Sequence, residues 1–311
     1  MYELPPNVVI EDECLRDGLQ SEKTQLSVEE IIGFIKGMEA AGVRRIQVGS
    51  FVHPKWVPQM ANTDEVFRRL ERRSDVTYTA LVLNEKGLQR AIACKVPHLS
   101  VSISASEMHS RKNTNRTLAE SMVQIRDMIS GSVNAGIVTR GGIQSAFGCA
   151  YEGAISPDVV CDIARLYDRL GAHEINLADS AGLGNPKSID ALARRVRAEV
   201  SERVKLSLHL HDTRGLGVAN MVAGLQAGIT IFDVALGGLG GCPFIPGAAG
   251  NVAAEDAAYA LEEMGVATGI DWRKLADLAL VLEKRIGRRL PGRLAHLGAG
   301  ANACVTTSSN G

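Results

Sequence analysis

"VKLSLHLHDTRG", residues 204–215, combines a strand pattern with two histidines and a glycine-containing turn. Successive side chains of a strand point to opposite faces, so His209 and His211 share one face and Leu210 lies on the other. Two interpretations fit this pattern. The imidazoles either pack as a hydrogen-bonded polar layer, or they present two ligands to one metal ion.

Working outward from this stretch, seven more short apolar or β-branched runs alternate with amphipathic helical segments. Repeated strand–helix units predict an α/β fold of the (β/α)8 TIM-barrel type, whose typical size is about 250 residues. A doubly wound open sheet is the alternative, but "CLRDGLQ" (14–20) lacks the glycine fingerprint of that fold after its first strand. The seven predicted strands are 8–13, 44–50, 76–83, 98–104, 136–147, 173–179 and 229–236.

Helix signals separate the strands. Ser27 and Glu30 form a capping-box pattern, and Gly42 is placed to end that helix. Ser156–Pro157 and Asn185–Pro186 are two further helix starts. No linker divides the chain, so we expect one domain over 1–311, with the barrel at about 7–265 and added C-terminal helices at about 270–300.

The composition limits the classes of partner. The chain has 311 residues, 45% of them hydrophobic, and a formal net charge of −1 with scattered basic residues. We therefore expect no nucleic-acid or membrane partner. The N-terminus lacks a secretory pattern, and the six cysteines form no C-x-x-C pair, so a reduced, cytoplasmic protein is expected.

In a TIM barrel, active-site residues follow the carboxyl ends of the strands. Arg16 and Asp17 follow the first strand and are either a structural ion pair or part of a site. Asp17 would meet His209 and His211 at the same mouth. One carboxylate and two imidazoles without thiolates favour an octahedral divalent ion, Mg²⁺ or Mn²⁺.

Other strands and their loops add polar groups to this end. The glycine-rich loop 237–251 carries Cys242, which is either incidental or an acid on a lid, and ends in Asn251. Asn251 is either the cap of a helix over about 252–264 or a metal ligand. Asp179 ends the sixth strand, and Gln47 is expected to face inward from the second. Packing alone would not bring so many polar groups to one end.

Six motifs resemble the 3-hydroxy-3-methylglutaryl-CoA lyase family of metal-dependent barrels, which is related to the isopropylmalate and homocitrate synthases. The resemblance covers nearly the whole chain. The motifs are "RDGLQ", "SFVHPKWVPQM", "SVSISASE", "AFGCAYEG", "LHLHDT" and "GGLGGCPFIPGAAGN".

The resemblance implies roles for residues of this chain. Asp17, His209, His211 and Asn251 correspond to the metal ligands. Arg16 corresponds to the cation that stabilises the enolate of departing acetyl-CoA, and Cys242 to an acid/base on the lid. Asp179 corresponds to a catalytic carboxylate and Gln20 to a substrate-proximal residue. A homodimer acting on an acyl-CoA is also implied.

Two positions depart from the family pattern. Gln47, which is expected to bind substrate, stands where the resemblance implies a glutamate that supports catalysis; the change removes a charge and a proton acceptor. Arg214 stands where a bulky neutral residue is expected.

The expected reaction is metal-assisted cleavage of 3-hydroxy-3-methylglutaryl-CoA, or of a 3-hydroxy-3-alkyl analogue, to acetyl-CoA and a ketone such as acetoacetate. Three alternatives stay open: an acetyl-CoA-dependent synthase, a non-haem iron oxygenase, and a non-catalytic acyl-CoA binder.

Overall fold

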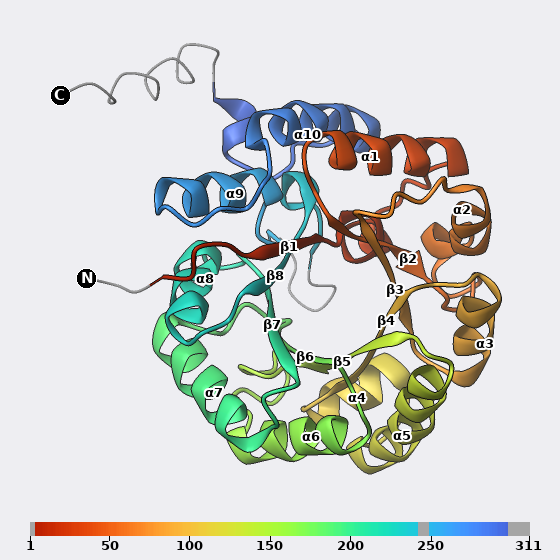
Figure 1. Ribbon diagram of the computed structural model, residues 1–311, viewed down its shortest axis with the longest axis vertical. Helices are drawn as coiled ribbons and strands as arrows, with labels where there is room; N and C mark the ends of the chain where they lie inside the picture. Colours follow the sequence, from red (N-terminus) through yellow and green to blue (C-terminus); the bar gives the residue numbers. More distant parts are fainter. Residues whose placement is uncertain (1–3, 242–248, 298–311) are drawn as a thin grey trace.

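The computed structural model describes residues 4–241 and 249–297. Eight parallel strands form a closed barrel in which β1 pairs with both β2 and β8 (Figure 1). This architecture confirms the predicted TIM barrel. The strands are β1 (Val9–Asp12), β2 (Arg45–Ser50), β3 (Thr77–Val82), β4 (His98–Ser104), β5 (Val138–Gln144), β6 (Glu174–Asp179), β7 (Lys205–Leu210) and β8 (Ile231–Val234).

Helices surround the barrel, and α10 lies beside α1 at the outer edge (Figure 1). They are α1 (Val28–Ala40), α2 (Thr63–Arg69), α3 (Glu85–Ala93), α4 (Glu107–Thr114), α5 (Leu118–Asn134), α6 (Pro157–Arg169), α7 (Pro186–Glu199), α8 (Gly217–Gln226), α9 (Ala254–Glu263) and α10 (Trp272–Ile286). Short helical turns are η1 (Cys14–Gly18), η2 (Leu19–Ser21), η3 (Pro58–Met60), η4 (Leu236–Gly238) and η5 (Leu294–His296).

The local signals explain where several helices begin and end. Ser27 and Glu30 form the predicted capping box of α1, and Asn185 caps α7. Gly42 follows α1 with φ +98°, and a Cβ there would lie 2.2 Å from the carbonyl oxygen of Gly269. Only glycine meets both conditions at low cost.

Several predicted boundaries differ from the structure by two or three residues, and two of them affect residues near the site. The fifth strand ends at Gln144 rather than 147, because Ser145 has φ +57° and leaves the extended conformation. The helix expected at about 252 begins at Ala254 and is preceded by Ala253 at its cap position. Asn251 is therefore not a helix cap.

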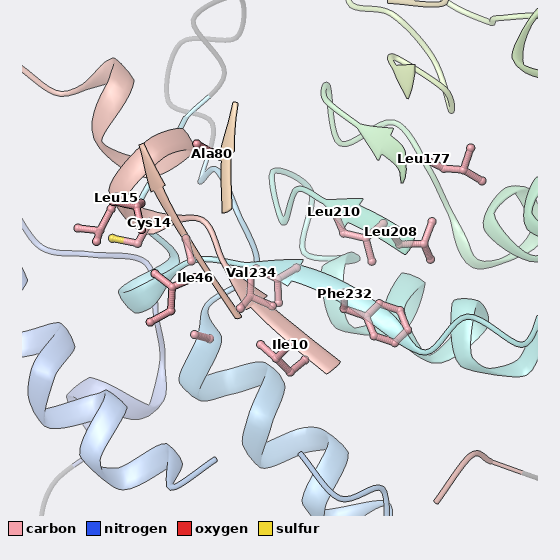
Figure 2. Close-up of a cluster of buried hydrophobic side chains, with 14 of the residues drawn as sticks. Ile10, Cys14, Leu15, Ile46, Ala80, Leu177, Leu208, Leu210, Phe232 and Val234 are labelled. Carbon is pink, nitrogen blue, oxygen red and sulfur yellow. The ribbon is translucent and has the colours of Figure 1, made fainter. Parts of the chain in front are cut away.

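The strands separate an apolar layer from a polar interior. Ile10, Ile46, Leu208, Phe232 and Val234 are buried in the hydrophobic core of the barrel wall and the surrounding helices (Figure 2). The residues that alternate with them carry charged or hydrogen-bonding side chains. This alternation directs polar chemistry into the barrel and apolar packing outward.

No helix within the described ranges is both long enough and apolar enough to span a membrane.

Two buried carboxyls each brace a segment that follows a strand, Asp12 the segment after β1 and Glu255 the segment after β8. Asp12 accepts a hydrogen bond from the amide of Cys14 at 2.8 Å, and Glu255 accepts one from the amide of Gly237 at 3.0 Å. The second oxygen of each carboxyl has no hydrogen-bond partner among the described residues. Burial raises the pKa of Asp12 to about 7 and that of Glu255 to about 8.

These raised pKa values predict a loss of stability as pH increases. The folded state binds more protons than the unfolded state between the ordinary carboxyl pKa near 4 and the folded values near 7 and 8. As pH rises through that window, each carboxyl should therefore lower the free energy of unfolding by about 1.4 kcal/mol per pH unit. Asp12→Asn and Glu255→Gln mimic the protonated forms. Urea unfolding from pH 5 to 8 should show a shallower pH dependence for both variants.

Glu263→Gln is the matched control, because Glu263 is exposed on the same helix as Glu255. It should keep the wild-type pH dependence. Unchanged slopes in Asp12→Asn and Glu255→Gln would refute the assignment of these protons.

Candidate active site

A cavity of about 840 Å³ opens where the strands end. Arg16, Asp17 and Gln20 enter it from the segment after β1, and His209 and His211 enter it from β7 and the residue after it. The single turn of π-helix η1 follows β1 directly and carries Arg16 and Asp17 to this mouth. The structure therefore joins the segments that the sequence analysis expected to meet.

Three side chains converge on one point within the cavity. The Nε2 atoms of His209 and His211 are 3.0 Å apart, and they lie 4.0 and 3.8 Å from Oδ2 of Asp17. These groups are close enough to hold one metal ion.

Asn251 lies beside this cluster, and its backbone pairs with that of His211. Its Nδ2 donates to Oδ2 of Asp17 at 3.0 Å and to the carbonyl of Leu239 at 3.1 Å. Its Oδ1 is buried and has no hydrogen-bond partner in the described ranges. An unpaired buried amide oxygen beside two imidazoles and a carboxylate is a donor set that fits a divalent cation.

The electrostatics of the cluster favour positive charge at its centre. Burial opposes ionisation of Asp17, but Arg16 and the two histidines hold its pKa well below its usual range. Burial likewise lowers the pKa of His209, yet hydrogen bonds with Asp233 and Glu13 and the charges of nearby carboxylates raise it to about 10. The same negative surroundings that hold a proton on His209 would stabilise a metal ion.

Arg16 lies beside this cluster of candidate metal ligands. Its guanidinium donates to Oδ1 of Asp17 at 2.5 Å, to Oε2 of Glu13 at 2.6 Å and to Oε1 of Gln47. Gln20 donates to the same Oδ1 of Asp17 at 2.9 Å. Arg16 is therefore held in one orientation while it lines the cavity.

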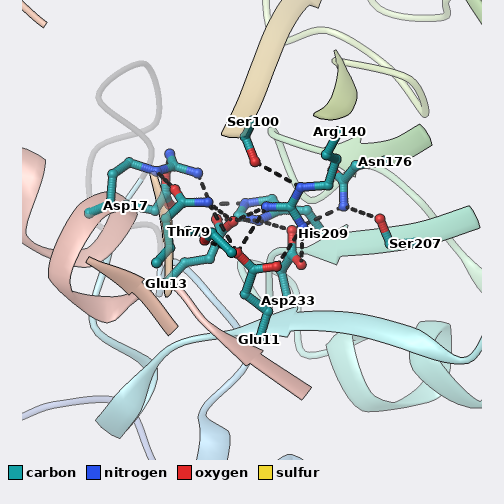
Figure 3. Close-up of polar contacts among 12 residues, drawn as sticks. Glu11, Glu13, Asp17, Thr79, Ser100, Arg140, Asn176, Ser207, His209 and Asp233 are labelled. Atoms are coloured by element: carbon teal, nitrogen blue, oxygen red, sulfur yellow. Dashed lines mark hydrogen bonds and ion pairs between the residues drawn. The ribbon is translucent and has the colours of Figure 1, made fainter. Parts of the chain in front are cut away.

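A buried network of charges supports these residues from below (Figure 3). Arg140 is at its centre and forms ion pairs with Glu13 at 2.7 Å, Asp233 at 2.8 Å and Glu11 at 3.0 Å. Our sequence analysis did not identify this network. Its other members are Arg45, Thr79, Ser100, Glu174, Asn176 and Ser207.

One sequence signal marks the network. Strands buried on both faces usually read as near-continuous apolar runs. Here polar residues interrupt the apolar runs at a spacing of two, as with Glu11 in β1 and Glu13 just after it, or Glu174 and Asn176 in β6. That periodicity assigns them to the barrel interior.

Asp179 does not point into the cavity. Its carboxylate accepts hydrogen bonds from the amides of Leu183 at 2.8 Å and Gly184 at 3.0 Å, and burial raises its pKa. Arg214 donates to the carbonyls of Ala181 and Gly182, both at 2.8 Å. Both side chains thus brace the loop after β6.

Cys242 lies outside the described residues.

The chain matches the family model described as HMGL-like over residues 7–282. It is 37% identical to a hydroxymethylglutaryl-CoA lyase of Bacillus subtilis, over 93% of this chain and 96% of that protein. It is 39% identical to a 3-hydroxy-3-isohexenylglutaryl-CoA/hydroxymethylglutaryl-CoA lyase of Pseudomonas aeruginosa, over 92% and 96% of the two chains.

A solved structure is similar over the same extent. An HMG-CoA lyase from Acinetobacter baumannii, in complex with coenzyme A and 3-methylmalate, superimposes with a TM-score of 0.89 at 36% identity. The match covers 100% of this chain and 99% of that one. With the barrel and the clustered histidines at its mouth, these similarities confirm the resemblance: the chain belongs to the HMGL-like family and is a lyase.

Proposed function

We propose that the chain cleaves the C2–C3 bond of 3-hydroxy-3-methylglutaryl-CoA, or of a close 3-hydroxy-3-alkyl analogue. The products are acetyl-CoA and acetoacetate, or the matching ketone. The observation that carries this proposal is the convergence of Asp17, His209 and His211 beside Arg16 in one cavity. The relatives' names support the substrate class.

Asp17, His209, His211 and Asn251 would hold the metal ion. The ion, Mg²⁺ or Mn²⁺, would act as a Lewis acid toward substrate oxygens when bound. A general base in the site accepts the proton of the tertiary hydroxyl, and that oxygen becomes a carbonyl as the C2–C3 bond breaks. The electron pair of that bond passes to the thioester, which leaves as an enolate.

Arg16 would stabilise this enolate, because a fixed cation beside the developing negative charge needs no reorganisation. Gln20 lines the cavity next to Asp17 and would contact the substrate. Cys242 would return a proton to carbon, which completes acetyl-CoA. Asp179 would support catalysis by holding the loop after β6 through the amides of Leu183 and Gly184.

The outer part of the cavity suits the coenzyme. Lys112 and Arg116 line it and would attract the phosphates of coenzyme A. We also propose that the protein is a cytoplasmic homodimer, as the family resemblance implies, with no nucleic-acid or membrane partner.

His209→Ala should abolish metal-dependent cleavage, because it removes one ligand and leaves the remaining site with fewer donors. Acetyl-CoA release from 3-hydroxy-3-methylglutaryl-CoA with Mg²⁺ or Mn²⁺ should fall by at least about 100-fold. A chelator should have the same effect on wild type, and added Mn²⁺ should reverse it. Longer 3-alkyl analogues belong in the same assay.

His296→Ala is the control, since His296 pairs with Glu283 outside the cavity. It should retain wild-type turnover. Turnover that survives both His209→Ala and chelation would contradict a metal-dependent reaction, and no cleavage of any tested thioester would overturn the substrate assignment.

Arg16→Gln should lower kcat by about 100- to 1000-fold, because the enolate loses its fixed cation. Mn²⁺ binding should persist, since Asp17 and both histidines remain. Steady-state kinetics and Mn²⁺ titration separate the two effects. Arg214→Gln removes an arginine whose hydrogen bonds, within the described residues, go to the loop after β6, and it should reduce kcat far less. Equal losses in the two variants would count against a role for Arg16 in the reaction itself.

A further inference from the structure

The buried carboxylate of Glu13 contacts both Arg16 and His209, and so links the candidate enolate-stabilising cation to the candidate metal ligands. Its Oε2 accepts from Nη2 of Arg16 at 2.6 Å and lies 3.2 Å from Nδ1 of His209. Its Oε1 accepts from Nη2 of Arg140 at 2.7 Å and from Nε2 of Gln47 at 2.8 Å. The residue is 1% exposed, so these contacts fix the carboxylate in place.

The neutral amide of Gln47 can both accept a hydrogen bond from Arg16 and donate hydrogen bonds to the carboxylates around it. Its Oε1 accepts from Arg16, and its Nε2 donates to Glu13 and, at 3.3 Å, to Oε1 of Glu11. A glutamate at position 47 would keep the acceptor but lose both hydrogens. Three carboxylates would then face one another without the donor that now joins them, which is unfavourable in a buried site.

We propose that Glu13, directly after β1, is a positioning residue that orients both Arg16 and His209, and that positions 13 and 47 form an exchangeable carboxylate–amide pair. The carboxylate of Glu13, which follows β1, thereby supplies the charge that a glutamate at position 47 would carry. The roles given to Arg16 and His209 rest on the proposed function.

The contact to His209 gives this proposal a consequence that does not depend on turnover. The imidazole has Nε2 directed at His211 and Asp17, and Nδ1 directed at Glu13. A carboxylate on the far nitrogen keeps Nδ1 protonated and leaves Nε2 as the ligand, and loss of such a partner typically weakens metal affinity 10- to 100-fold. Asp233 lies 3.5 Å from Nδ1 of His209 and would still hold that nitrogen in part. We therefore expect a loss of metal affinity of about 10-fold, the lower end of that range.

The contact to Arg16 predicts a separate loss in turnover. Without Glu13, the guanidinium keeps Asp17 and Gln47 as partners but loses the carboxylate that holds Nη2. Misplacing this cation weakens its stabilisation of the transition state more than it weakens substrate binding. We therefore expect kcat to fall while KM changes little.

The test compares four full-length proteins: wild type, Glu13→Gln, Gln47→Glu and the double variant. Mn²⁺ affinity is measured without substrate by titration with detection of free Mn²⁺ by electron paramagnetic resonance. Turnover of 3-hydroxy-3-methylglutaryl-CoA is measured with saturating Mn²⁺. We expect about 10-fold weaker Mn²⁺ binding and about 10- to 100-fold lower kcat in Glu13→Gln. Gln47→Glu should also lower kcat, and the double variant should recover kcat to within about threefold of wild type.

Glu174→Gln is the matched control. Glu174 is a buried carboxylate of the same network, but it bonds Arg45 at 2.8 Å and Ser207 at 2.7 Å and contacts neither Arg16 nor His209. The change should lower the thermal midpoint without changing Mn²⁺ affinity. Glu13→Asp provides a charged variant with a shorter reach, and its kcat should lie between those of wild type and Glu13→Gln.

Two results would overturn the proposal. One is a Glu13→Gln variant that loses only thermal stability, as Glu174→Gln does. The other is a double variant no more active than the poorer single variant. The proposed function fails in a different way: if wild type binds Mn²⁺ and Glu13→Gln weakens that binding, but no thioester is cleaved, Glu13 still positions His209 and the substrate assignment is wrong.

Discussion

The buried guanidinium of Arg140 is the interaction on which the barrel interior depends. It forms ion pairs with carboxylates from β1, β6 and β8 and with Glu13 directly after β1, so one side chain from β5 joins strands from across the barrel. An isolated charge in this position would be very costly, whereas a fully paired one is tolerated. The network thereby favours the register that brings these residues to one level, because a shifted strand would leave charges unpaired.

The same network also holds His209, which belongs to the cluster of candidate metal ligands, in position. Glu13 and Asp233 belong to the network and also face Nδ1 of His209, while Nε2 of that ring faces Asp17 and His211. The histidine thus connects a rigid, charged layer to the cluster that could hold a metal ion. Rigid support of this kind keeps functional groups in place before substrate arrives.

Prediction from the sequence succeeded where short-range physics decides the outcome. The period of two in residues 204–211 was enough to place His209 and His211 on one face, and the capping box at Ser27 was enough to start α1. It left Asn251 open between a helix cap and a metal ligand, because cap position depends on where α9 begins, and that helix begins at Ala254. It also missed Glu13, which pairs with Arg16 nearby in the sequence but also with Arg140 and His209 far away.

The sequence by itself determined the alternation of strands and helices, the barrel class, and the set of polar residues at the strand ends. These follow from periodicity, capping and the parallel direction of the strands, which are local properties or consequences of one topology. Only the tertiary structure decided which polar groups meet. Asp179 accepts hydrogen bonds from the amides of the loop that follows it. Gln47, by contrast, forms hydrogen bonds with Arg16, Glu11 and Glu13. Pairing inside a closed barrel depends on register and tilt, and a strand pattern alone does not specify either.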